Sequence, residues 1–363
     1  MKNNPEIPSY PPYYFVKITE KIRRFFLRMN RRFTQPAVAI WEMVLNMWLA
    51  AGIGVVTELG IADLLKDGPK SIDQLAALTN THTESLYRVM RMVASHGIFR
   101  EKKGRRFVLT PLAKPLQDDK IRYLILVHLR PNHFEMFGSL IKSVRTGKTV
   151  SGETSSRVLF DYLGNEETRN EWFNKAMTSI SRIQIPALLS AFRFKKFRNI
   201  IDLGGGEGLF LATVLSKAEK SRGVLFDLPS ALLKSGDIIE RYSLTDRMKP
   251  VAGDFFESVP EGGDLYMLKN VLHDWDDESS LKILRNIHKV MDHKSSLLVI
   301  DVVLDEGNQP SLGKMSDILM MAAAGGKERT STQWKNLLAE AGFRIRKIHP
   351  TISPHYIIEA KKI

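Results

Sequence analysis

The feature that most constrains the fold of this chain is a glycine-rich turn between an apolar strand and an apolar helix. The turn lies in the sequence IIDLGGGEGLFLATVL, residues 200–215, and places glycines at positions 204, 206 and 208. Glycine lets the backbone approach a ligand closely, and the helix that follows points unpaired N–H groups at that ligand. We therefore predict that this turn holds a cofactor.

From Phe197 onward, strand patterns alternate with helix patterns. Strands are predicted at residues 199–203, 223–228, 249–253, 264–269, 296–303, 344–349 and 356–362. Helices are predicted between several of them, among others over residues 280–291 and 330–343. This alternation is typical of a doubly wound α/β sheet. Because no helical pattern separates the last two strands, we expect an antiparallel strand at the edge of the sheet.

The residues around the turn indicate which cofactor it binds. A dinucleotide fingerprint requires a glycine where this chain has Leu209, and a Walker lysine is also missing, so phosphate binding is disfavoured. Asp227, at the end of the second strand, fits an acceptor for ribose hydroxyls. After the third strand, Asp254 suits an exocyclic amine and Phe255 suits the face of a purine. Each acid alone is an ordinary turn residue, but in this order they favour adenosine without phosphate.

The length of 363 residues favours two domains, and an apolar content of 44% is typical of globular proteins. We divide the chain into a basic N-terminal arm (1–35), a helical winged-helix-like domain (36–120), a helical linker with pocket-covering helices (121–195) and the α/β domain (196–363). The absence of cysteine excludes disulfides and thiol nucleophiles. No run of about 18 apolar residues and no secretory signal is visible, so a cytoplasmic protein is expected.

A winged-helix pattern lies within residues 71–110. Ser71 can cap a helix that ends near Leu78, Thr83 starts a second helix, and a hairpin turns at Lys103 and Gly104. One interpretation is DNA binding through the second helix. The other is a scaffold for dimerisation or for closing a pocket. Because an extended domain of catalytic type follows, we favour the scaffold and expect no nucleic-acid partner.

The net charge of +13 is concentrated in the N-terminal arm, where eight Lys and Arg residues and two Glu residues give a net +6. A helix over this segment would carry Ile18, Ile22, Phe25, Phe26 and Met29, which is typical of an interfacial membrane helix. The alternative, which we favour at this point, is an arm that packs on a partner subunit or stays mobile. A weak membrane contact is kept as a secondary hypothesis.

The decapeptide NVLHDWDDES, residues 270–279, contains the candidate catalytic base. His273 follows the fourth strand at its carboxyl end, where ligands lie in open α/β sheets. A histidine with a pKa near neutrality can accept a proton. Asp276 or Asp277 can cap the helix that follows, so two of the acids have a structural explanation. A plain turn histidine is the alternative.

Several motifs, in order and spacing, resemble those of the S-adenosylmethionine-dependent O-methyltransferases related to plant caffeate and bacterial hydroxyindole, phenazine and polyketide enzymes. The motifs are DLGGGEG, FDLP, GDFFESVP, YMLKNVLHDWDD and GGKERT, while ELGIADLL and FVLTPLAKPL are similar to the dimerisation domain of that family. The resemblance covers roughly residues 36–363. It implies a class I, Rossmann-like methyltransferase domain, S-adenosyl-L-methionine as cofactor and a homodimer formed through the N-terminal domain.

The resemblance also implies roles for individual residues. The implied cofactor residues are Gly204, Gly206, Gly208, Asp227, Leu228, Asp254, Phe255, Lys269, Ser181 and Met177. His273 occupies the position of the base, and Asp301 and Glu328 match the carboxylates that orient it. An apolar acceptor pocket is expected from Trp172, Phe173, Met320 and Met321, with Asp274 beside the base; core packing is an equal alternative for the apolar four.

Two positions depart from the plant enzymes of that family. Asp301 stands where they usually have glutamate, so the carboxylate has a shorter reach. Residues 322–324 are alanines where they have His-Asn-Pro, so an asparagine contact to a phenylpropanoid is absent and a different acceptor is expected.

The function predicted from the sequence is transfer of a methyl group to a hydroxyl of a small aromatic or polyketide-like molecule, with His273 as general base and without a metal ion. Such an enzyme aligns the acceptor oxygen with the methyl carbon and removes the acceptor's proton. One alternative is an enzyme of the same fold that uses the bound cofactor without methylating. A winged-helix DNA-binding regulator is the more distant alternative.

Overall fold

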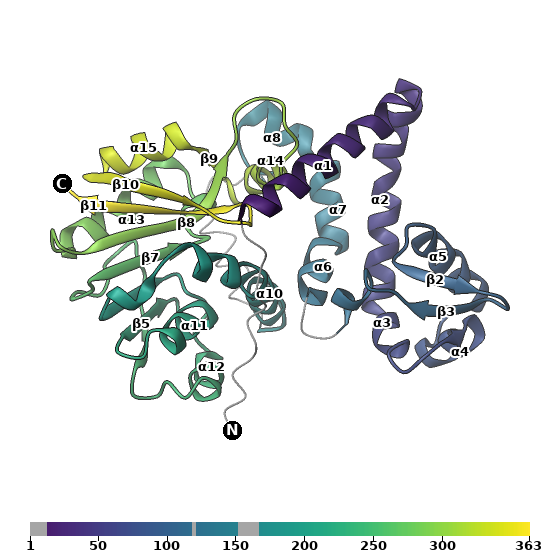
Figure 1. Ribbon diagram of the computed structural model, residues 1–363, viewed down its shortest axis with the longest axis horizontal. Coiled ribbons are helices and arrows are strands. Elements are labelled where there is room, and N and C mark those ends of the chain that lie inside the picture. Colours follow the sequence, from purple (N-terminus) through teal and green to yellow (C-terminus); the bar gives the residue numbers. More distant parts are fainter. Residues whose placement is uncertain (1–12, 118–120, 152–166) are drawn as a thin grey trace. The chain divides into compact units, whose positions relative to one another are not determined.

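The computed structural model describes residues 13–117, 121–151 and 167–363 (Figure 1). It divides into two compact units. The smaller unit comprises residues 20–135 and 175–180, and the larger comprises residues 136–174 and 181–363 together with the N-terminal residues to Thr19. Our division of the chain at residues 35, 120 and 195 stays a prediction.

The N-terminal half of the chain is mostly helical. Its elements are α1 (Tyr13–Arg32), α2 (Pro36–Glu58), α3 (Ile61–Leu64), β1 (Lys70–Ser71), α4 (Ile72–Thr79), α5 (Thr83–Ser95), β2 (Phe99–Lys102), β3 (Arg106–Leu109), η1 (Lys114–Leu116), α6 (Arg122–His128), α7 (Pro131–Gly138), α8 (Leu140–Thr146) and α10 (Glu167–Ala191).

Helices α4 and α5 and the β2–β3 hairpin follow the order that the sequence predicted. Ser71 caps α4 through a capping box, because its Oγ accepts from the Gln74 N–H at 3.2 Å and its own N–H donates to the Gln74 side chain at 2.9 Å. Met90 of α5 is fully buried in the core of this unit. β1 pairs with β3, which completes a three-stranded sheet of order β1-β3-β2. The name winged helix stays a prediction for this arrangement.

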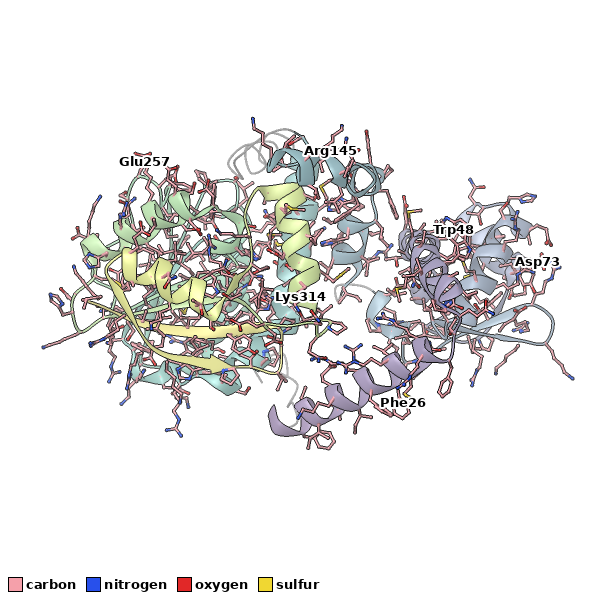
Figure 2. All side chains as sticks on the ribbon, turned by 90° about the horizontal axis from the view of Figure 1, so that it is seen from above. Phe26, Trp48, Asp73, Arg145, Glu257 and Lys314 are labelled. Atoms are coloured by element: carbon pink, nitrogen blue, oxygen red, sulfur yellow. The ribbon has the colours of Figure 1, made fainter. Side chains whose placement is uncertain are left out.

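Helix α2 is long and apolar. By length and composition alone it could cross a membrane, with a mean hydropathy of 1.6 and only 17% of the apolar window buried. Trp41 and Trp48 are each 57% exposed, and Figure 2 labels Trp48 on this helix. An apolar helix that its own chain does not cover is also the expected form of a subunit interface.

The larger unit is built on one sheet. Its elements are η2 (Phe194–Lys196), β4 (Asn199–Leu203), α11 (Leu209–Lys217), β5 (Arg222–Asp227), α12 (Ser235–Arg241), β6 (Met248–Ala252), β7 (Leu265–Lys269), η3 (Leu272–Asp274), α13 (Asp277–Val290), β8 (Ser296–Leu304), α14 (Leu312–Leu319), η4 (Met320–Ala324), β9 (Arg329–Thr330), α15 (Ser331–Glu340), β10 (Phe343–Pro350) and β11 (His355–Lys362).

The sheet order is β10-β11-β8-β7-β4-β5-β6, and β9 pairs with β8. β4, β5, β6, β7 and β8 pair in parallel, as the alternating pattern predicted. The predicted antiparallel strand at the edge of the sheet is confirmed, because the edge strand β10 pairs antiparallel with β11. β11 also pairs antiparallel with β8, so the second strand of the β10–β11 hairpin inserts between the first strand and β8.

Both faces of the sheet are covered, and strand β7 shows why. Tyr266 and Leu268 pack into the core under α13 and α15, whereas Leu265 and Met267 pack into the core under α10, α11 and α12 (Figure 1). Alternate residues of a strand point to opposite faces, so a strand that is apolar throughout is buried on both sides. The doubly wound α/β fold predicted for this half of the chain is confirmed, and its parallel strands share one carboxyl-terminal edge.

Candidate functional site

The glycine turn lies at the carboxyl end of β4, near the centre of the sheet. Gly204, Gly206 and Gly208 have φ angles of +68°, +59° and +87°, which glycine adopts without steric cost. Gly208 is the N-cap of α11. A Cβ atom on Gly205 would lie 2.4 Å from the Leu225 side chain and 2.8 Å from Asp202 Oδ2, so a side chain cannot fit there. At Gly206, by contrast, a Cβ atom would meet nothing within 4 Å, so the backbone is open at that position.

Asp227 is tied to this turn by backbone hydrogen bonds. Its Oδ2 accepts from the Gly206 N–H at 2.7 Å, and its Oδ1 accepts from the Leu228 N–H at 2.7 Å. Burial raises the pKa of the carboxyl group, and the two N–H groups oppose that effect. A carboxylate fixed in this way keeps one lone pair on each oxygen for a ligand hydroxyl.

Asp254 and Phe255 follow β6 and complete this side of the site. Asp254 Oδ1 accepts from the Phe256 N–H at 2.8 Å, which fixes the turn. Phe255 Cε1 lies 3.6 Å from the place where a Cβ on Gly204 would stand. The structure thus brings the predicted aromatic wall next to the predicted glycine turn.

Lys269 ends β7 and is buried between polar groups. Its Nζ donates to Ser181 Oγ at 3.0 Å, which brings together two residues that the sequence had assigned to the cofactor. Burial lowers the pKa of Lys269, and the charges of Asp202 and Asp301 oppose that effect. Burial raises the pKa of Asp202 to about 7, and among the described residues neither of its carboxylate oxygens has a hydrogen-bond partner. The sequence analysis missed Asp202, although an acid inside an apolar strand was a usable signal.

His273 lies in η3, directly after β7, with only 9% of its surface exposed. Its Nδ1 is 3.0 Å from Glu328 Oε1 and 3.8 Å from Asp301 Oδ1, while its Nε2 is 3.6 Å from Asp274 Oδ1. Burial alone would lower the pKa of the imidazole. The charges of Asp274 and Asp301 and the hydrogen bond with Glu328 outweigh burial and raise the pKa of His273 to about 10.

The carboxylates around His273 differ in how they are held. Glu328 Oε1 also accepts from Ser316 Oγ at 2.7 Å, and the hydrogen bond with His273 helps to keep the pKa of Glu328 low despite burial. Asp301 has no hydrogen-bond partner for either oxygen within the described part of the chain, and burial raises its pKa to about 7. Glu328 is therefore the carboxylate that orients the ring, and Asp301 acts on it through charge at longer range.

A second, half-buried histidine lies near this cluster. His355, at the start of β11, has ring nitrogens 3.2 and 3.3 Å from the Gln184 side-chain nitrogen. Burial lowers the pKa of His355 to about 3, and the charges of His273 and Lys269 lower it further. His355 is therefore neutral and adds no charge beside the base. Sequence reasoning did not single it out.

Arg329 fixes the backbone on both sides of His273. The side chain is fully buried, and its guanidinium donates to Leu272 O at 2.8 Å, to Trp275 O at 2.9 Å and to Asp277 Oδ1 at 2.8 Å. Asp276 caps α13 by accepting from the Ser279 N–H at 2.7 Å, so of the two acids proposed as caps the first one serves.

Arg329→Ala is expected to lower the free energy of unfolding by about 2–5 kcal/mol, because the carbonyls of Leu272 and Trp275 would each lose a buried partner at about 1–3 kcal/mol. Urea unfolding followed by circular dichroism measures the loss. Arg329→Lys is the graded comparison, since a lysine keeps the charge but cannot reach both carbonyls. An unchanged free energy of unfolding in the alanine variant would contradict the stabilising role of these hydrogen bonds.

Gly326, in the GGKERT motif, packs against the same turn. A Cβ on Gly326 would lie 2.1 Å from the carbonyl oxygen of His273 and 2.4 Å from the carbonyl carbon of Asp274. These are backbone atoms, which cannot move aside as a flexible side chain can. The position of the candidate base therefore depends on the absence of a side chain at residue 326.

The remaining predicted residues are placed only by their unit, their exposure and the elements beside them. Trp172, Phe173, Met320 and Met321 belong to the larger unit and are half-buried, and η4, which holds the two methionines, lies beside η3. Their role in an acceptor pocket stays a prediction, as does that of Leu228, which is 38% exposed. Met177 belongs to the smaller unit, in the stretch 175–180, so its predicted place beside the cofactor also stays a prediction.

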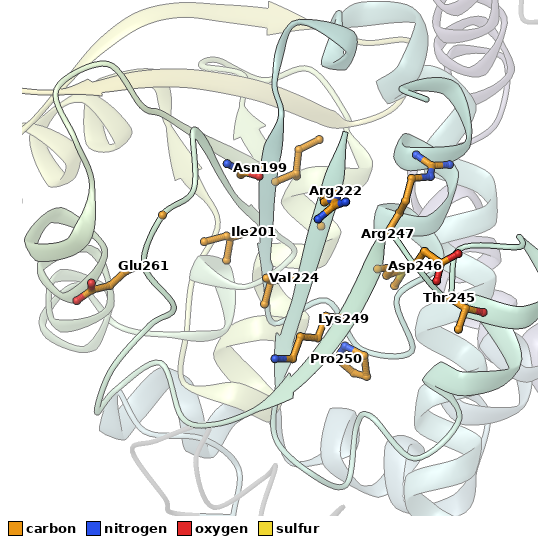
Figure 3. Close-up of a pocket in the computed structure, with 14 residues that line it drawn as sticks. Asn199, Ile201, Arg222, Val224, Thr245, Asp246, Arg247, Lys249, Pro250 and Glu261 are labelled. Carbon is orange, nitrogen blue, oxygen red and sulfur yellow. The ribbon is translucent and has the colours of Figure 1, made fainter. Parts of the chain in front are cut away.

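A surface cavity of about 660 Å³ lies at the opposite edge of the sheet, at the amino ends of β4, β5 and β6 (Figure 3). Arg222, Arg247 and Lys249 are among its lining residues. The Arg247 guanidinium is occupied by backbone carbonyls, including those of Leu215 and Ser221 at 3.1 Å. Because ligands of open α/β sheets bind at the carboxyl ends of the strands, this cavity is not a candidate active site.

Comparisons with known proteins agree with the fold. Residues 137–344 match the family model of an O-methyltransferase domain, and residues 41–118 match that of an O-methyltransferase dimerisation domain. A phenazine O-methyltransferase of Lysobacter antibioticus is 35% identical over 338 residues, which is 92% of this chain and 99% of that protein. A mitomycin biosynthesis 6-O-methyltransferase of Streptomyces lavendulae is 33% identical over 333 residues, which is 88% of this chain and 93% of that protein.

The fold also matches solved structures. The crystal structure of human N-acetylserotonin methyltransferase in complex with S-adenosylmethionine superposes with a TM-score of 0.83 at 25% identity, and the match covers 91% of this chain and 98% of that one.

Proposed function

Because the chain belongs to the S-adenosylmethionine-dependent O-methyltransferases, we propose that it methylates a hydroxyl group of a small aromatic or polyketide-like molecule, with His273 as the general base. The observation that carries this proposal is the buried imidazole at the carboxyl end of β7, with Nδ1 hydrogen-bonded to Glu328 at 3.0 Å. This hydrogen bond leaves Nε2 as the nitrogen that accepts a proton.

The residues at the glycine turn fit the cofactor of the family. The turn formed by Gly204, Gly206 and Gly208 would accommodate its methionine part, Asp227 would accept from its ribose, and Asp254 with Phe255 would hold its adenine. Lys269 and Ser181 would bind its charged end. When bound, the cofactor supplies an electrophilic methyl group on a sulfonium ion.

In the proposed mechanism, the protein mainly positions groups and moves one proton. Glu328 orients the ring of His273 through a hydrogen bond with Nδ1. Nε2 then takes the proton of the acceptor hydroxyl as the hydroxyl oxygen attacks the methyl carbon. Asp274 and Asp301, at 3.6 and 3.8 Å from the ring nitrogens, stabilise the imidazolium that results. The burial of the site excludes water, which strengthens these electrostatic interactions.

The pH dependence follows from the pKa of about 10 that the carboxylates give to His273. Below its pKa the ring is protonated and cannot accept a proton, so kcat/KM is expected to rise with pH through the neutral range. Glu328→Gln removes a charge that raises this pKa, so the rising limb should move to lower pH. A pH profile of kcat/KM measures the shift.

Two controls make this prediction specific. The first control compares two acceptors whose hydroxyl groups differ in pKa. If the rising limb of the pH profile lies at the same pH for both, it reports a group of the enzyme and not of the acceptor. Glu261→Gln, at an exposed position outside the site, should leave the limb in place. A limb that Glu328→Gln does not move would contradict the proposed coupling between Glu328 and the base.

The acceptor is proposed to be a flat, mostly apolar molecule. The half-buried methionines of η4 lie beside η3 and adapt to such a shape. The chain lacks the His-Asn-Pro sequence of the plant enzymes at residues 322–324, which argues against a phenylpropanoid. The names of the relatives, a phenazine and a mitomycin O-methyltransferase, point to polycyclic acceptors and to secondary metabolism.

We further propose a homodimer formed through the N-terminal domain, in which the exposed apolar surface of α2 contributes to the interface. A cytoplasmic location is proposed from the biosynthetic names of the relatives. The DNA-binding alternative is disfavoured, because the segment that suggested it lies within residues 41–118, which match a dimerisation domain.

The test is incubation of the protein with methyl-labelled cofactor and a panel of phenols, flavonoids, hydroxyindoles, hydroxyquinones and hydroxyphenazines. Transfer of label to a hydroxyl of one class supports the proposal. Tight binding of the cofactor by calorimetry, without transfer to any class, would instead favour the alternative of a non-methylating enzyme. A gel shift with random duplex DNA at about 0.15 M salt tests the regulator hypothesis.

A further inference from the structure

Helix α1 carries an apolar face and, beside it, a basic face. At about 100° per residue, one arc of roughly 100° carries only apolar side chains. These are Phe15, Ile18, Ile22, Phe25, Phe26 and Met29. The adjoining arc carries Lys21, Arg24, Arg28, Arg31 and Arg32, and Arg23 lies on the other flank of the apolar arc. The two arcs do not overlap, so the helix has a purely apolar face and a basic face.

The apolar face of α1 is exposed. Phe15, Ile22, Phe25 and Phe26 are 57%, 51%, 58% and 65% exposed, and Figure 2 labels Phe26 on this helix. A cluster of exposed, bulky apolar side chains marks a binding surface. The dimerisation domain of the family begins at residue 41, after α1 ends, so that domain does not account for this surface.

The charge of α1 indicates what the surface binds. The helix holds seven Lys and Arg residues and one acid, Glu20. Glu20 pairs with Arg23 at 3.0 Å and lies 3.8 Å from Arg24, so it offsets charge only at the middle of the helix. The α1 helix of a second copy, which is equally basic, would bring like charges together on this surface. An anionic surface would instead neutralise them.

We infer that α1 lies flat on the surface of a bilayer that contains anionic lipids. Its apolar face enters the boundary between headgroups and acyl chains, and its basic face pairs with lipid phosphates. Each basic residue near such a surface contributes about fivefold to the partition coefficient. A basic helix of this kind without aromatic side chains would bind only by charge; here three phenylalanines add apolar burial that salt does not weaken.

The test is sedimentation of the full-length protein with vesicles of phosphatidylcholine alone or with about one third phosphatidylglycerol. The protein should bind the anionic vesicles much more tightly than the neutral ones, to which only its apolar face contributes binding. Raising the salt from about 0.1 M to about 1 M should weaken the binding by screening. No vesicle contains an acceptor and no turnover is measured, so the result is independent of the proposed enzymatic function.

Two variants of α1 test the basic face and the apolar face separately. Lys21→Gln/Arg28→Gln/Arg31→Gln should lower binding to anionic vesicles by on the order of 100-fold, at about fivefold per charge. The matched control, Arg222→Gln/Lys249→Gln/Lys347→Gln, removes the same charge from exposed positions outside α1 and should bind as the parent does. Phe25→Ser/Phe26→Ser should abolish the binding that survives in high salt. Circular dichroism checks that each variant is folded.

Three outcomes would overturn the inference. The first is equal binding to neutral and anionic vesicles. The second is an equal loss in the α1 triple variant and its control, which would show that only net charge matters. The third is dissociation of a dimer by the phenylalanine double variant in sedimentation velocity with vesicle binding unchanged, which would assign the apolar face to a second copy.

Discussion

Replacement of His273 by glutamine is expected to lower the rate of methyl transfer by on the order of 10²- to 10⁴-fold, which is the usual contribution of a general base. Glutamine keeps a polar side chain of similar reach and can still meet Glu328, but it cannot accept the proton of the acceptor hydroxyl. Single-turnover assays with labelled cofactor measure the chemical step directly.

Cofactor binding provides the control for this variant. The residues proposed to hold the cofactor are tied to the glycine turn by their own hydrogen bonds, such as that of Asp227 with the Gly206 N–H at 2.7 Å. The affinity measured by calorimetry should therefore change little. A glutamine variant with the full rate of transfer would remove His273 from the mechanism, whatever the identity of the acceptor.

Gly326→Ala is expected to have an effect of similar size without touching an ionisable group. The new Cβ would lie 2.1 Å from the carbonyl oxygen of His273, so η3 must move. A displacement of about 1 Å at a reacting group can cost on the order of 100-fold in rate. The measurement is kcat for the best acceptor, together with the melting temperature.

The matched control for Gly326→Ala is Gly236→Ala. Gly236 lies on α12, and a Cβ there would meet nothing within 4 Å, so activity should be unchanged and stability equal or slightly higher. If Gly326→Ala were as active as this control, the turn would be more pliable than its backbone contacts indicate, and the proposed dependence of His273 on residue 326 would be wrong.

The strands could be predicted from the sequence because their apolar runs and the turns between them are local signals. All seven strands predicted after Phe197 are present, and the glycine turn stands where the pattern placed it. The partners of the last strand could not be predicted. Whether β11 pairs at the edge or inserts beside β8 depends on contacts between Ile357 and Ile300, which are far apart in the chain.

The candidate site likewise contains residues that could be predicted from the sequence and residues that could not. His273 and Glu328 were named from motifs, and the structure places them 3.0 Å apart. Arg329 and Gly326 were present in the quoted GGKERT motif, but their contacts with the turn around His273 join segments about fifty residues apart. A single sequence gives no signal for such contacts, so the residues that contact the turn around His273 remained unnoticed, while the candidate base itself was named.

The two edges of the sheet offer different possibilities for labelling the molecule. The proposed site lies at the carboxyl edge, whereas the turn between β6 and β7 runs past the opposite edge. Glu261 in that turn is exposed, whereas Gly262 beside it has a φ of +81° that a side chain would strain, so residue 261 is the position to label. A fluorescent reporter attached at this turn would follow the protein onto a vesicle while leaving the reaction undisturbed.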